Sequence, residues 1–474
     1  MESSLQTALR AAFHPRSIAV IGASNDLNKL GGSEIRLLRE AGYAGKIYPI
    51  NPKEESIQGL KAYPSVADVP DEVERAVIIL PTRLVPDAVR DCAKKKVKVV
   101  QIYSAGFGEF GEAGKALEQE LLAAAKEAGM RIIGPNCIGT YSPSGRISFI
   151  RGTSLQSGHV AFVSQSGGIA FDIIDRGEVL GIRFSKVVSI GNSIDLDHPD
   201  YLEYLLEDPD TKVIGCYMES VRDGQRLLQL LKRLTPKKPV VVLKGGRTES
   251  GTQSVASHTG SLAGNYQIWQ ALFRQTGVIP VTSVDEMLTA LLALQSLKTY
   301  PAGRVAMIGN GGGATVLASD TLEERGLKLA KLSSTTVERI AQLGVANNGR
   351  NVNPIDLPAY ELSVKEGQLF GDLVRAFSQD PNVNYILFHI NLIPFATYGN
   401  LAEILEQFAR QLETVDPSAV NLVGVLRSNE KPEIEAVRFE AMRKLHQLGI
   451  PVFRTVEQGI YGIAVAANGL GGVR

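Results

Sequence analysis

Val163-Ser164-Gln165-Ser166-Gly167-Gly168 joins an apolar run, residues 158–163, to a segment with the pattern of a helix. Similar junctions occur at Ile21-Gly22-Ala23-Ser24-Asn25 and at Ile308-Gly309-Asn310-Gly311-Gly312-Gly313. A strand that passes through small residues into a helix is the repeating unit of a parallel sheet covered by helices. The first amides of such a helix lack partners inside it, so we expect each junction to offer donors for phosphate or carboxylate. Simple packing of the helix on the strand is the alternative at each junction.

Each junction opens a series of apolar runs of strand length that alternate with amphipathic segments of helix length. The runs lie at residues 17–22, 46–50, 76–80, 97–103 and 131–134 in the first series, 158–163, 184–190, 212–218 and 239–244 in the second, and 303–309, 384–389, 419–426 and 450–453 in the third. Polar segments with Gly and Pro at residues 142–145 and 297–303 separate the series. We therefore predict an α/β protein with three domains, at residues 1–142, 143–298 and 299–474.

The composition is that of a globular protein without a charge bias. The 474 residues include 50 Lys and Arg against 50 Asp and Glu, so no net charge draws the chain to nucleic acid or to an anionic membrane. Three cysteines far apart in the sequence argue against a disulfide framework and against a four-ligand metal site. No apolar run approaches the ~18 residues of a membrane span, and the N-terminus lacks the pattern of a signal peptide. We expect a cytoplasmic protein that binds neither nucleic acid nor membrane.

The first junction departs from the dinucleotide fingerprint. Gly-x-Gly-x-x-Gly requires glycine where this chain has Ser24, and the next glycines are Gly31 and Gly32. An NAD-dependent oxidoreductase is therefore disfavoured. A small-residue turn can still receive the phosphates of another nucleotide, and Lys53 follows the second run, where a cation could meet a ribose phosphate. A solvated lysine is the alternative for Lys53.

The second junction is better suited to phosphate, because two hydroxyls and two glycines at a helix start provide donors without obstruction. A serine nucleophile is disfavoured, since the Gly-x-Ser-x-Gly pattern is absent. Glu219 follows the run at 212–218, at the edge of the sheet where α/β proteins bind ligands. A carboxylate there could hold one nitrogen of an imidazole and leave the other free to attack. Capping of the next helix is the alternative for Glu219.

A histidine stands among small residues in Gln253-Ser254-Val255-Ala256-Ser257-His258-Thr259-Gly260-Ser261-Leu262-Ala263-Gly264, beyond the run at 239–244. We expect this stretch to be a loop in which small neighbours leave the imidazole room to move. Histidine titrates near neutral pH, so His258 could serve as a nucleophile or phosphate carrier. A loop histidine held by hydrogen bonds is the alternative.

The remaining histidines carry less weight, with the exception of His198. It lies in Asp195-Leu196-Asp197-His198-Pro199-Asp200, a group that could hold a metal. Capping of the helix that begins there explains the same residues more simply, and we assign no metal site.

With these residues in hand, the chain resembles the nucleoside-diphosphate-forming acyl-CoA synthetases, the superfamily of succinyl-CoA synthetase and ADP-forming acetyl-CoA synthetase. The features that carry the resemblance are Ser257-His258-Thr259-Gly260-Ser261, the junction at 164–168 and Glu219, in the order that the family uses. The resemblance covers the full length and looks closest to a separate α subunit of the acetyl-CoA type. It implies a Rossmann-like CoA-binding domain followed by two flavodoxin-like CoA-ligase domains.

The resemblance also assigns roles to individual residues. It makes His258 the phosphohistidine and Glu219 the carboxylate that orients it. It places phosphate on the second junction, at Ser164, Ser166, Gly167 and Gly168. It places CoA on Gly22, Ala23, Ser24, Asn25, Lys53, Ser104, Ala105 and Gly106, with Lys46 as a competitor for Lys53. Phe171 lies near the end of the phosphate helix, where succinyl-CoA relatives have a tyrosine, so succinate is disfavoured.

The implied reaction interconverts a carboxylic acid, CoA and ATP with acyl-CoA, ADP and phosphate, through an acyl phosphate and the phosphohistidine. In this superfamily ADP and Mg²⁺ bind an ATP-grasp module, for which three α/β domains leave no room in 474 residues. The resemblance therefore implies an ATP-grasp β subunit as partner, in an α2β2 assembly. A scaffold that binds CoA or senses acyl-CoA without turnover is the alternative function, disfavoured by His258 and Glu219.

Overall fold

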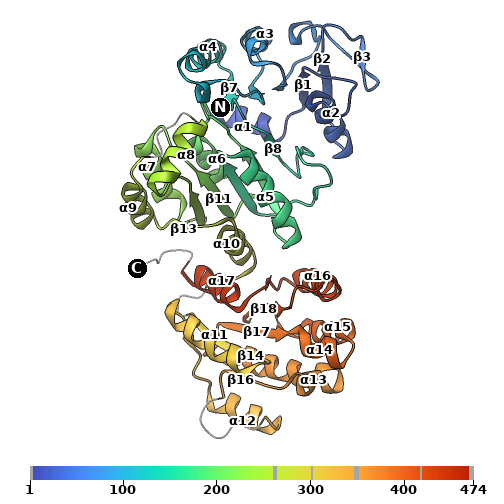
Figure 1. The fold of residues 1–474 in the computed structure, drawn as a ribbon, viewed down its shortest axis with the longest axis vertical. Helices are drawn as coiled ribbons and strands as arrows, with labels where there is room; N and C mark the ends of the chain where they lie inside the picture. The colour runs from blue at the N-terminus through green and yellow to red at the C-terminus, as the bar shows by residue number, and fades with distance from the viewer. Residues whose placement is uncertain (1–3, 260–263, 300–302, 346–351, 417–418, 469–474) are drawn as a thin grey trace. The chain divides into compact units, whose positions relative to one another are not determined.

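The computed structural model describes residues 4–259, 264–299, 303–345, 352–416 and 419–468 (Figure 1). They form two compact units, of which the first ends at Met287 and the second begins at Leu288. The first unit contains two large sheets and the second contains one.

The first sheet is parallel throughout, in the order β2-β1-β5-β6-β7. Alternate residues of β1 face opposite sides of the sheet: Ala19 and Ile21 join the core under two helices, whereas Ile18 and Val20 join the core under another. Helices on both faces make this a doubly wound sheet. The strands are β1 (Ser17–Ile21), β2 (Lys46–Ile50), β5 (Arg75–Ile78), β6 (Val99–Ile102) and β7 (Arg131–Ile133); α2 (Leu30–Glu40) covers one face and α3 (Val85–Lys94) and α4 (Glu112–Ala128) cover the other.

Short elements complete this part of the chain: the hairpin β3 (Ser56–Ile57) and β4 (Leu60–Lys61), and the 3₁₀ turns η1 (Val66–Asp68), η2 (Thr82–Leu84) and η3 (Gly108–Phe110).

The second sheet has the order β13-β12-β11-β9-β10-β8, and only its edge strand β8 is antiparallel. Its strands are β8 (Gly139–Tyr141), β9 (Val160–Ser164), β10 (Phe184–Ser189), β11 (Val213–Met218), β12 (Val240–Lys244) and β13 (Ile279–Val281). One face packs on α1 (Ser4–Phe13), α6 (His198–Glu207), α7 (Gly224–Leu234) and α9 (Tyr266–Thr276). Helix α5 (Gly167–Val179) contacts β9 and β10; α8 (Glu249–Thr259) follows β12 and α10 (Val284–Ser296) follows β13 along the chain.

The third sheet, in the second unit, is parallel in the order β15-β14-β17-β18-β19, and β16 also pairs with β14. Its strands are β14 (Arg304–Gly309), β15 (Lys328–Leu329), β16 (Ile355–Asp356), β17 (Tyr385–Asn391), β18 (Asn421–Arg427) and β19 (Val452–Phe453). The main core lies under α12 (Ser334–Gln342), α13 (Ala359–Ser378), α14 (Leu392–Tyr398), α15 (Leu401–Glu413) and α16 (Pro432–Gln447). The remaining helices, α11 (Gly312–Glu324) and α17 (Val456–Asn468), contact each other.

All thirteen apolar runs named from the sequence contain a strand of these sheets. Two local expectations were wrong. Residues 253–259 are not a loop but the second part of α8, because the stretch from Glu249 has one glycine and no proline to interrupt a helix. Six short strands, β3, β4, β8, β13, β15 and β16, were missed, since two or three residues are too few to show alternation; β8 and β13 form the two edges of the second sheet.

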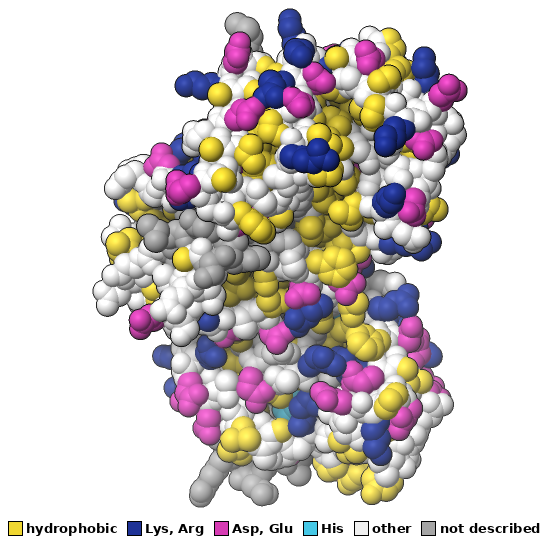
Figure 2. Space-filling model, turned by 45° about the horizontal axis from the view of Figure 1, so that its top comes forward, with side chains coloured by type: hydrophobic (Ala, Val, Ile, Leu, Met, Phe, Trp, Pro, Cys, Tyr) yellow, Lys and Arg dark blue, Asp and Glu magenta, His cyan; other side chains and the backbone are white. Residues whose placement is uncertain are grey.

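No helix in the described ranges is both long and apolar enough to cross a membrane. On the face drawn in Figure 2, basic and acidic side chains are interspersed and neither sign dominates a region.

Candidate active site

The second junction and Glu219 lie together at the switch point of the second sheet. After β9 the chain continues to β10 on one side of the sheet, whereas β11 lies on the other side of β9 and leads on to β12. Ser164 ends β9 and Glu219 follows β11, so the two features flank this point at the carboxyl edge of the sheet. Open α/β sheets bind their ligands here.

The junction at 164–168 is built to leave two amides open. Ser164 Oγ accepts from the amide of Ser166 at 3.1 Å, and Ser166 caps α5 by accepting from the amide of Ile169 at 3.3 Å. The amides of Gly167 and Gly168 have no hydrogen-bond partner in the described residues. A side chain at position 168 would meet nothing closer than Ser166 Oγ, at 3.9 Å. These open donors at the positive end of the α5 dipole suit an anion.

Glu219 is buried, and its two carboxyl oxygens differ. Oε1 accepts from the Tyr217 hydroxyl at 3.1 Å. Oε2 is buried without a hydrogen-bond partner in the described part of the chain. Burial and the neighbouring Glu219 carboxylate raise the pKa of the Tyr217 hydroxyl, so Tyr217 stays a donor. A buried acceptor without a donor is costly, so Oε2 is an open position for an N–H group.

Two residues that the sequence analysis did not assign to the site hold the Glu219 backbone. Gln165 Oε1 accepts from the amide of Glu219 at 2.6 Å, and Lys244 Nζ donates to the Glu219 carbonyl at 2.8 Å. Both residues could have been suspected from the sequence. Gln165 lies inside the junction motif, and Lys244 is a charged residue at the end of the apolar run at 239–244.

His258 lies in the last turn of α8, and its side chain falls outside the described residues, as do residues 260–263. Helix α8 lies against η3, the turn that follows Gly106 in the first sheet's domain. The helix that carries His258 is therefore next to one of the segments expected to bind CoA.

The first junction differs from the expectation of free amides. The amides of Gly22 and Ala23 both donate to the carbonyl of Ile50, at 3.1 and 3.3 Å, because β2 lies directly beside the end of β1. Ser24 Oγ accepts from the amide of Asp26, and Asn25 binds the backbone of Ser56 and Gln58. Two of the four amides are thus engaged, whereas those of Ser24 and Asn25 have no hydrogen-bond partner among the described residues.

A pocket of about 390 Å³ beside this turn brings Gly22 and Lys53 together. Its wall includes Leu80, beyond β5, so it lies at the switch point between β1 and β5. Lys53 is exposed, and no ion pair involves it among the described residues. Lys46 lies at the other end of β2 and is paired with Asp71 at 2.7 Å, so it is engaged away from the pocket.

Ser104, Ala105 and Gly106 follow β6 beside the same edge. The hydroxyl of Ser104 donates to the carbonyl of Leu80, a residue of the pocket wall. The amide of Gly106 donates to Glu109 at 2.6 Å, and Asn192 donates to the same carboxylate at 2.6 Å. Asn192 follows β10, so this network ties the loop after β6 to the ligand edge of the second sheet.

At the third junction, a carboxylate of the protein itself bonds to one of the amides. The carboxylate of Asp356, at the end of β16, accepts from the amide of Gly311 at 2.7 Å, so this junction does not present all its donors as expected. Arg427 Nη2 lies 3.5 Å from His389 Nδ1, and His389 Nε2 lies 3.1 Å from Thr315 Oγ1. Burial, followed by the charge of Arg427, lowers the pKa of His389 to about 4.

The group at 195–200 caps helices and binds arginine. Asp197 caps α6 in a capping box with Asp200, as the simpler interpretation predicted. Asp195 forms a double hydrogen bond with Arg131 at 2.8 to 3.1 Å. His198 is buried and lies 3.1 Å from the Tyr217 carbonyl. No cluster suited to a metal ion forms among the residues whose placement is described.

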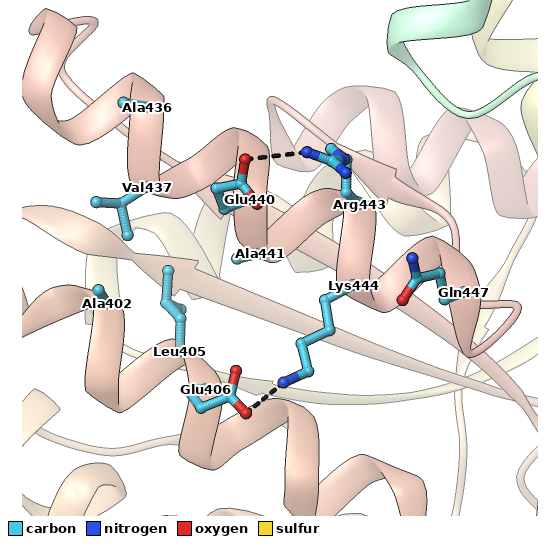
Figure 3. Close-up of a pocket in the computed structure, with 10 residues that line it drawn as sticks. All are labelled: Ala402, Leu405, Glu406, Ala436, Val437, Glu440, Ala441, Arg443, Lys444 and Gln447. Carbon is cyan, nitrogen blue, oxygen red and sulfur yellow. Dashed lines mark hydrogen bonds and ion pairs between the residues drawn. The ribbon is translucent and has the colours of Figure 1, made fainter. Parts of the chain in front are cut away.

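A surface groove of about 580 Å³ lies between α15 and α16, and none of the residues described above lines it (Figure 3). Its floor includes Leu405 and Val437. Figure 3 shows that its charged side chains pair with one another, Glu406 with Lys444 and Glu440 with Arg443. The groove thus offers no converging unpaired charge, and we assign it no ligand.

Comparisons with known proteins agree with this layout. Residues 16–143 match the family model described as a CoA binding domain, and residues 157–294 match the one described as a succinyl-CoA ligase like flavodoxin domain. The chain is 39% identical over 469 residues to the acetate–CoA ligase (ADP-forming) II subunit alpha of Pyrococcus furiosus, covering 97% of this chain and 98% of that protein. It is also 39% identical over 377 residues to an acetate–CoA ligase (ADP-forming) I of Archaeoglobus fulgidus, of which the match covers 54%.

A solved structure gives the same result for the fold. The dinucleotide forming acetyl-coenzyme A synthetase 1 of Ca. Korarchaeum cryptofilum, in complex with phosphate and ADP, aligns with a TM-score of 0.86 and 31% identity, over 97% of this chain and 96% of that chain. The fold and its ligand edges define a CoA-dependent ligase with a CoA-binding domain and flavodoxin-like ligase domains. The chain belongs to the family of ADP-forming acyl-CoA synthetases. Its full-length relatives in that family are the separate α subunits. The family and the fold class predicted from the sequence are both confirmed.

Proposed function

We propose that this chain is the α subunit of an enzyme that interconverts a small carboxylic acid, CoA and ATP with acyl-CoA, ADP and phosphate. One observation carries the mechanism: two open amides at the start of α5 and a buried carboxylate with one unpartnered oxygen flank the same switch point. The first suits a phosphoryl group and the second suits the N–H of an imidazole.

The reaction proceeds through two covalent phosphoryl compounds. A phosphate oxygen attacks the thioester carbonyl, the C–S bond breaks, and CoA leaves as the acyl phosphate forms. A ring nitrogen of His258 then attacks phosphorus, and the P–O bond to the acyl group breaks to release the acid. A terminal oxygen of ADP takes the phosphoryl group from His258 to give ATP, and synthesis of acyl-CoA runs through the same steps in reverse.

The residues of the second sheet divide the work of the phosphoryl transfer. Gly167 and Gly168 donate to the phosphoryl oxygens, with Ser164 and Ser166 holding the turn in shape. Glu219 Oε2 accepts a hydrogen bond from the protonated ring nitrogen of His258, which fixes the tautomer and leaves the other nitrogen to attack.

CoA binds at the edge of the first sheet. Gly22 lines the pocket at a positive φ of 90°, and a Cβ there would come within 2.1 Å of the Ile79 carbonyl, so the turn packs closely on the chain beyond β5 at this wall. Lys53 supplies a cation for a phosphate of CoA. Ala23, Ser24 and Asn25 shape the turn, and the loop of Ser104, Ala105 and Gly106 leads the thiol end toward the second sheet.

ADP, ATP and Mg²⁺ bind an ATP-grasp β subunit, in an α2β2 assembly. The three large sheets all belong to CoA-binding and flavodoxin-like folds, and the match to the longer Archaeoglobus relative accounts for 54% of that protein. Mg²⁺ bound through nucleotide phosphates on the partner fits the preference of this ion for oxygen ligands. The three buried, unbridged thiols, Cys92, Cys137 and Cys216, support a cytoplasmic location.

The test is phosphorylation of the purified chain by γ-labelled ATP in the presence of an ATP-grasp subunit. We expect acid-labile label on the wild-type chain and none on His258→Ala. Absence of label with a partner that binds ATP would contradict the mechanism and favour a CoA-binding scaffold without turnover.

A further inference from the structure

The backbone of Glu219 is held from both sides by side chains of neighbouring strands. In the sheet, β11 lies between β9 and β12. Gln165, just beyond β9, accepts from the amides of Glu219 and Ser220 at 2.6 and 3.0 Å. Lys244, the last residue of β12, donates to the Glu219 carbonyl at 2.8 Å. Beyond the end of the strand, two side chains thus supply bonds that a sheet ordinarily makes with backbone.

The ammonium group of Lys244 is buried in an environment that disfavours a charge. It is 2% exposed, and it binds only the carbonyls of Glu219 and Gly245 and the face of Trp269, 5.0 Å from the ring centre. No carboxylate forms an ion pair with it among the described residues, whereas the equally buried Lys186 has Asp208 at 2.8 Å. Burying an ammonium without an ion pair costs stability: burial lowers the pKa of Lys244 to about 8, although the charge of the nearby Glu219 carboxylate acts to raise it. A hydrophobic side chain would avoid the buried charge but would leave the carbonyls of Glu219 and Gly245 without this donor, so the lysine holds the backbone on this side of Glu219.

We propose that Gln165 and Lys244 are positioning residues that fix the Glu219 carboxylate relative to the phosphate junction. The proposal rests on the function given above for Glu219 and His258. Gln165 belongs to the junction itself, so its bond to the Glu219 amide sets the spacing between carboxylate and phosphoryl site. Lys244 prevents the opposite side of Glu219 from moving. A misplacement of about 1 Å can cost about 10²-fold in rate, so loss of either side chain slows phosphorylation of His258.

The experiment compares Lys244→Met with Lys238→Met. Lys238 precedes β12 and also donates to two backbone carbonyls, of Leu205 and Asp208 at 2.7 and 2.6 Å, but it lies far along the strand from Glu219. The measurements on the full chain are the rate of labelling by γ-labelled ATP with the ATP-grasp subunit, the Kd for CoA and the melting temperature. We expect Lys244→Met to label about 10 to 100-fold more slowly, with unchanged CoA affinity and a melting temperature no lower than that of Lys238→Met. Lys238→Met labels at the wild-type rate.

A double-mutant cycle with Glu219→Gln separates positioning from general damage. If Lys244 acts through Glu219, Lys244→Met should slow labelling by less than a further twofold when it is introduced into the Glu219→Gln chain. Gln165→Met tests the other side of Glu219 independently and should show the same pattern. Wild-type labelling rates in Lys244→Met and Gln165→Met, or full additivity with Glu219→Gln, would overturn the proposal while leaving the phosphohistidine mechanism intact. An unlabelled wild-type chain would instead overturn the mechanism on which it rests.

Discussion

Lys53 and Lys46 lie at opposite ends of one strand and are engaged differently. Lys46 begins β2 and is paired with Asp71, whereas Lys53 lies beyond its end and lines the pocket with Gly22. We expect Lys53→Ala to raise the Kd for CoA about tenfold, a loss of about 1.4 kcal/mol, because a cation for a phosphate is removed. Lys46→Ala should leave that Kd within twofold. Titration calorimetry on both variants checks this, and a larger effect at Lys46 would contradict the assignment.

His389 should make the second unit sensitive to acid. Its ring is buried between Thr315 and Arg427, with Asp356 beside both, and its pKa is lowered from 6.5 to about 4. Between these values the unfolded chain binds a proton that the folded chain does not, so stability falls as pH falls through this window. The slope for one group reaches about 1.4 kcal/mol per pH unit. Chemical unfolding between pH 7 and pH 5 should show a fall in stability that is smaller in His389→Gln than in the wild type; nearer pH 4, carboxylates with lowered pKa values such as Glu435 add to the slope of both. The exposed His159→Gln serves as the control and should behave like wild type.

Among the elements, the turn after β1 depends on a glycine for two reasons. Gly22 has a φ of 90°, and a Cβ would come within 2.1 Å of the Ile79 carbonyl. Gly59, in the β3–β4 hairpin, also has a positive φ, 77°, but open space around it. We expect Gly22→Ala to destabilise the chain by about 2–4 kcal/mol, backbone strain plus overpacking, and Gly59→Ala by only about 1–2 kcal/mol. Thermal melts of both variants measure the difference, and equal costs would show that the close approach at Gly22 is relieved elsewhere.

The elements also show how far the sequence could lead. Buried parallel strands read as continuous apolar runs, so all thirteen named runs contain a strand and the junctions were found with them. The apolar runs did not predict which backbone amides of each junction are engaged in hydrogen bonds. The amides of Gly22 and Ala23 are engaged by Ile50, and that of Gly311 by Asp356, because residues distant in sequence lie beside them. Among the described residues, the second junction keeps the amides of Gly167 and Gly168 open, and its two hydroxyls and two glycines are the local feature by which the sequence favoured it.

The site was predicted least well where it depends on side chains reaching between strands. Glu219 could be found because it follows an apolar run at the ligand edge of the sheet. Gln165 and Lys244 reach the backbone of Glu219 from two other strands, so their role depends on the order of strands in the sheet. That order is not written in the local sequence. Asn192, which joins the loop after β6 to the second sheet through Glu109, was missed for the same reason.

At the scale of the whole molecule, the two units meet inside one helix of the sequence. The first unit ends at Met287 and the second begins at Leu288, and both residues belong to α10. Within the second unit, Gly462 of α17 lies so close to α10 that a Cβ would come 3.3 Å from that of Ala293. A cut within α10 would therefore expose apolar surface, whereas a cut just before Val284 removes the helix intact.

This division predicts that residues 1–283 alone fold and bind CoA. The fragment keeps both large sheets of the first unit, since β13 ends at Val281, and it keeps every lining residue of the pocket with Gly22 and Lys53, the proposed CoA site. Of the contacts beyond the cut, the ion pair of Arg176 with Asp285 is exposed, and such pairs contribute about 0–1 kcal/mol. We expect a cooperative thermal transition and a Kd for CoA within twofold of the full chain, measured by calorimetry. A fragment ending at residue 298 carries the apolar part of α10 without the second unit and should aggregate more readily. If the shorter fragment failed to fold while the longer one bound CoA normally, α10 would belong to the first unit as a whole.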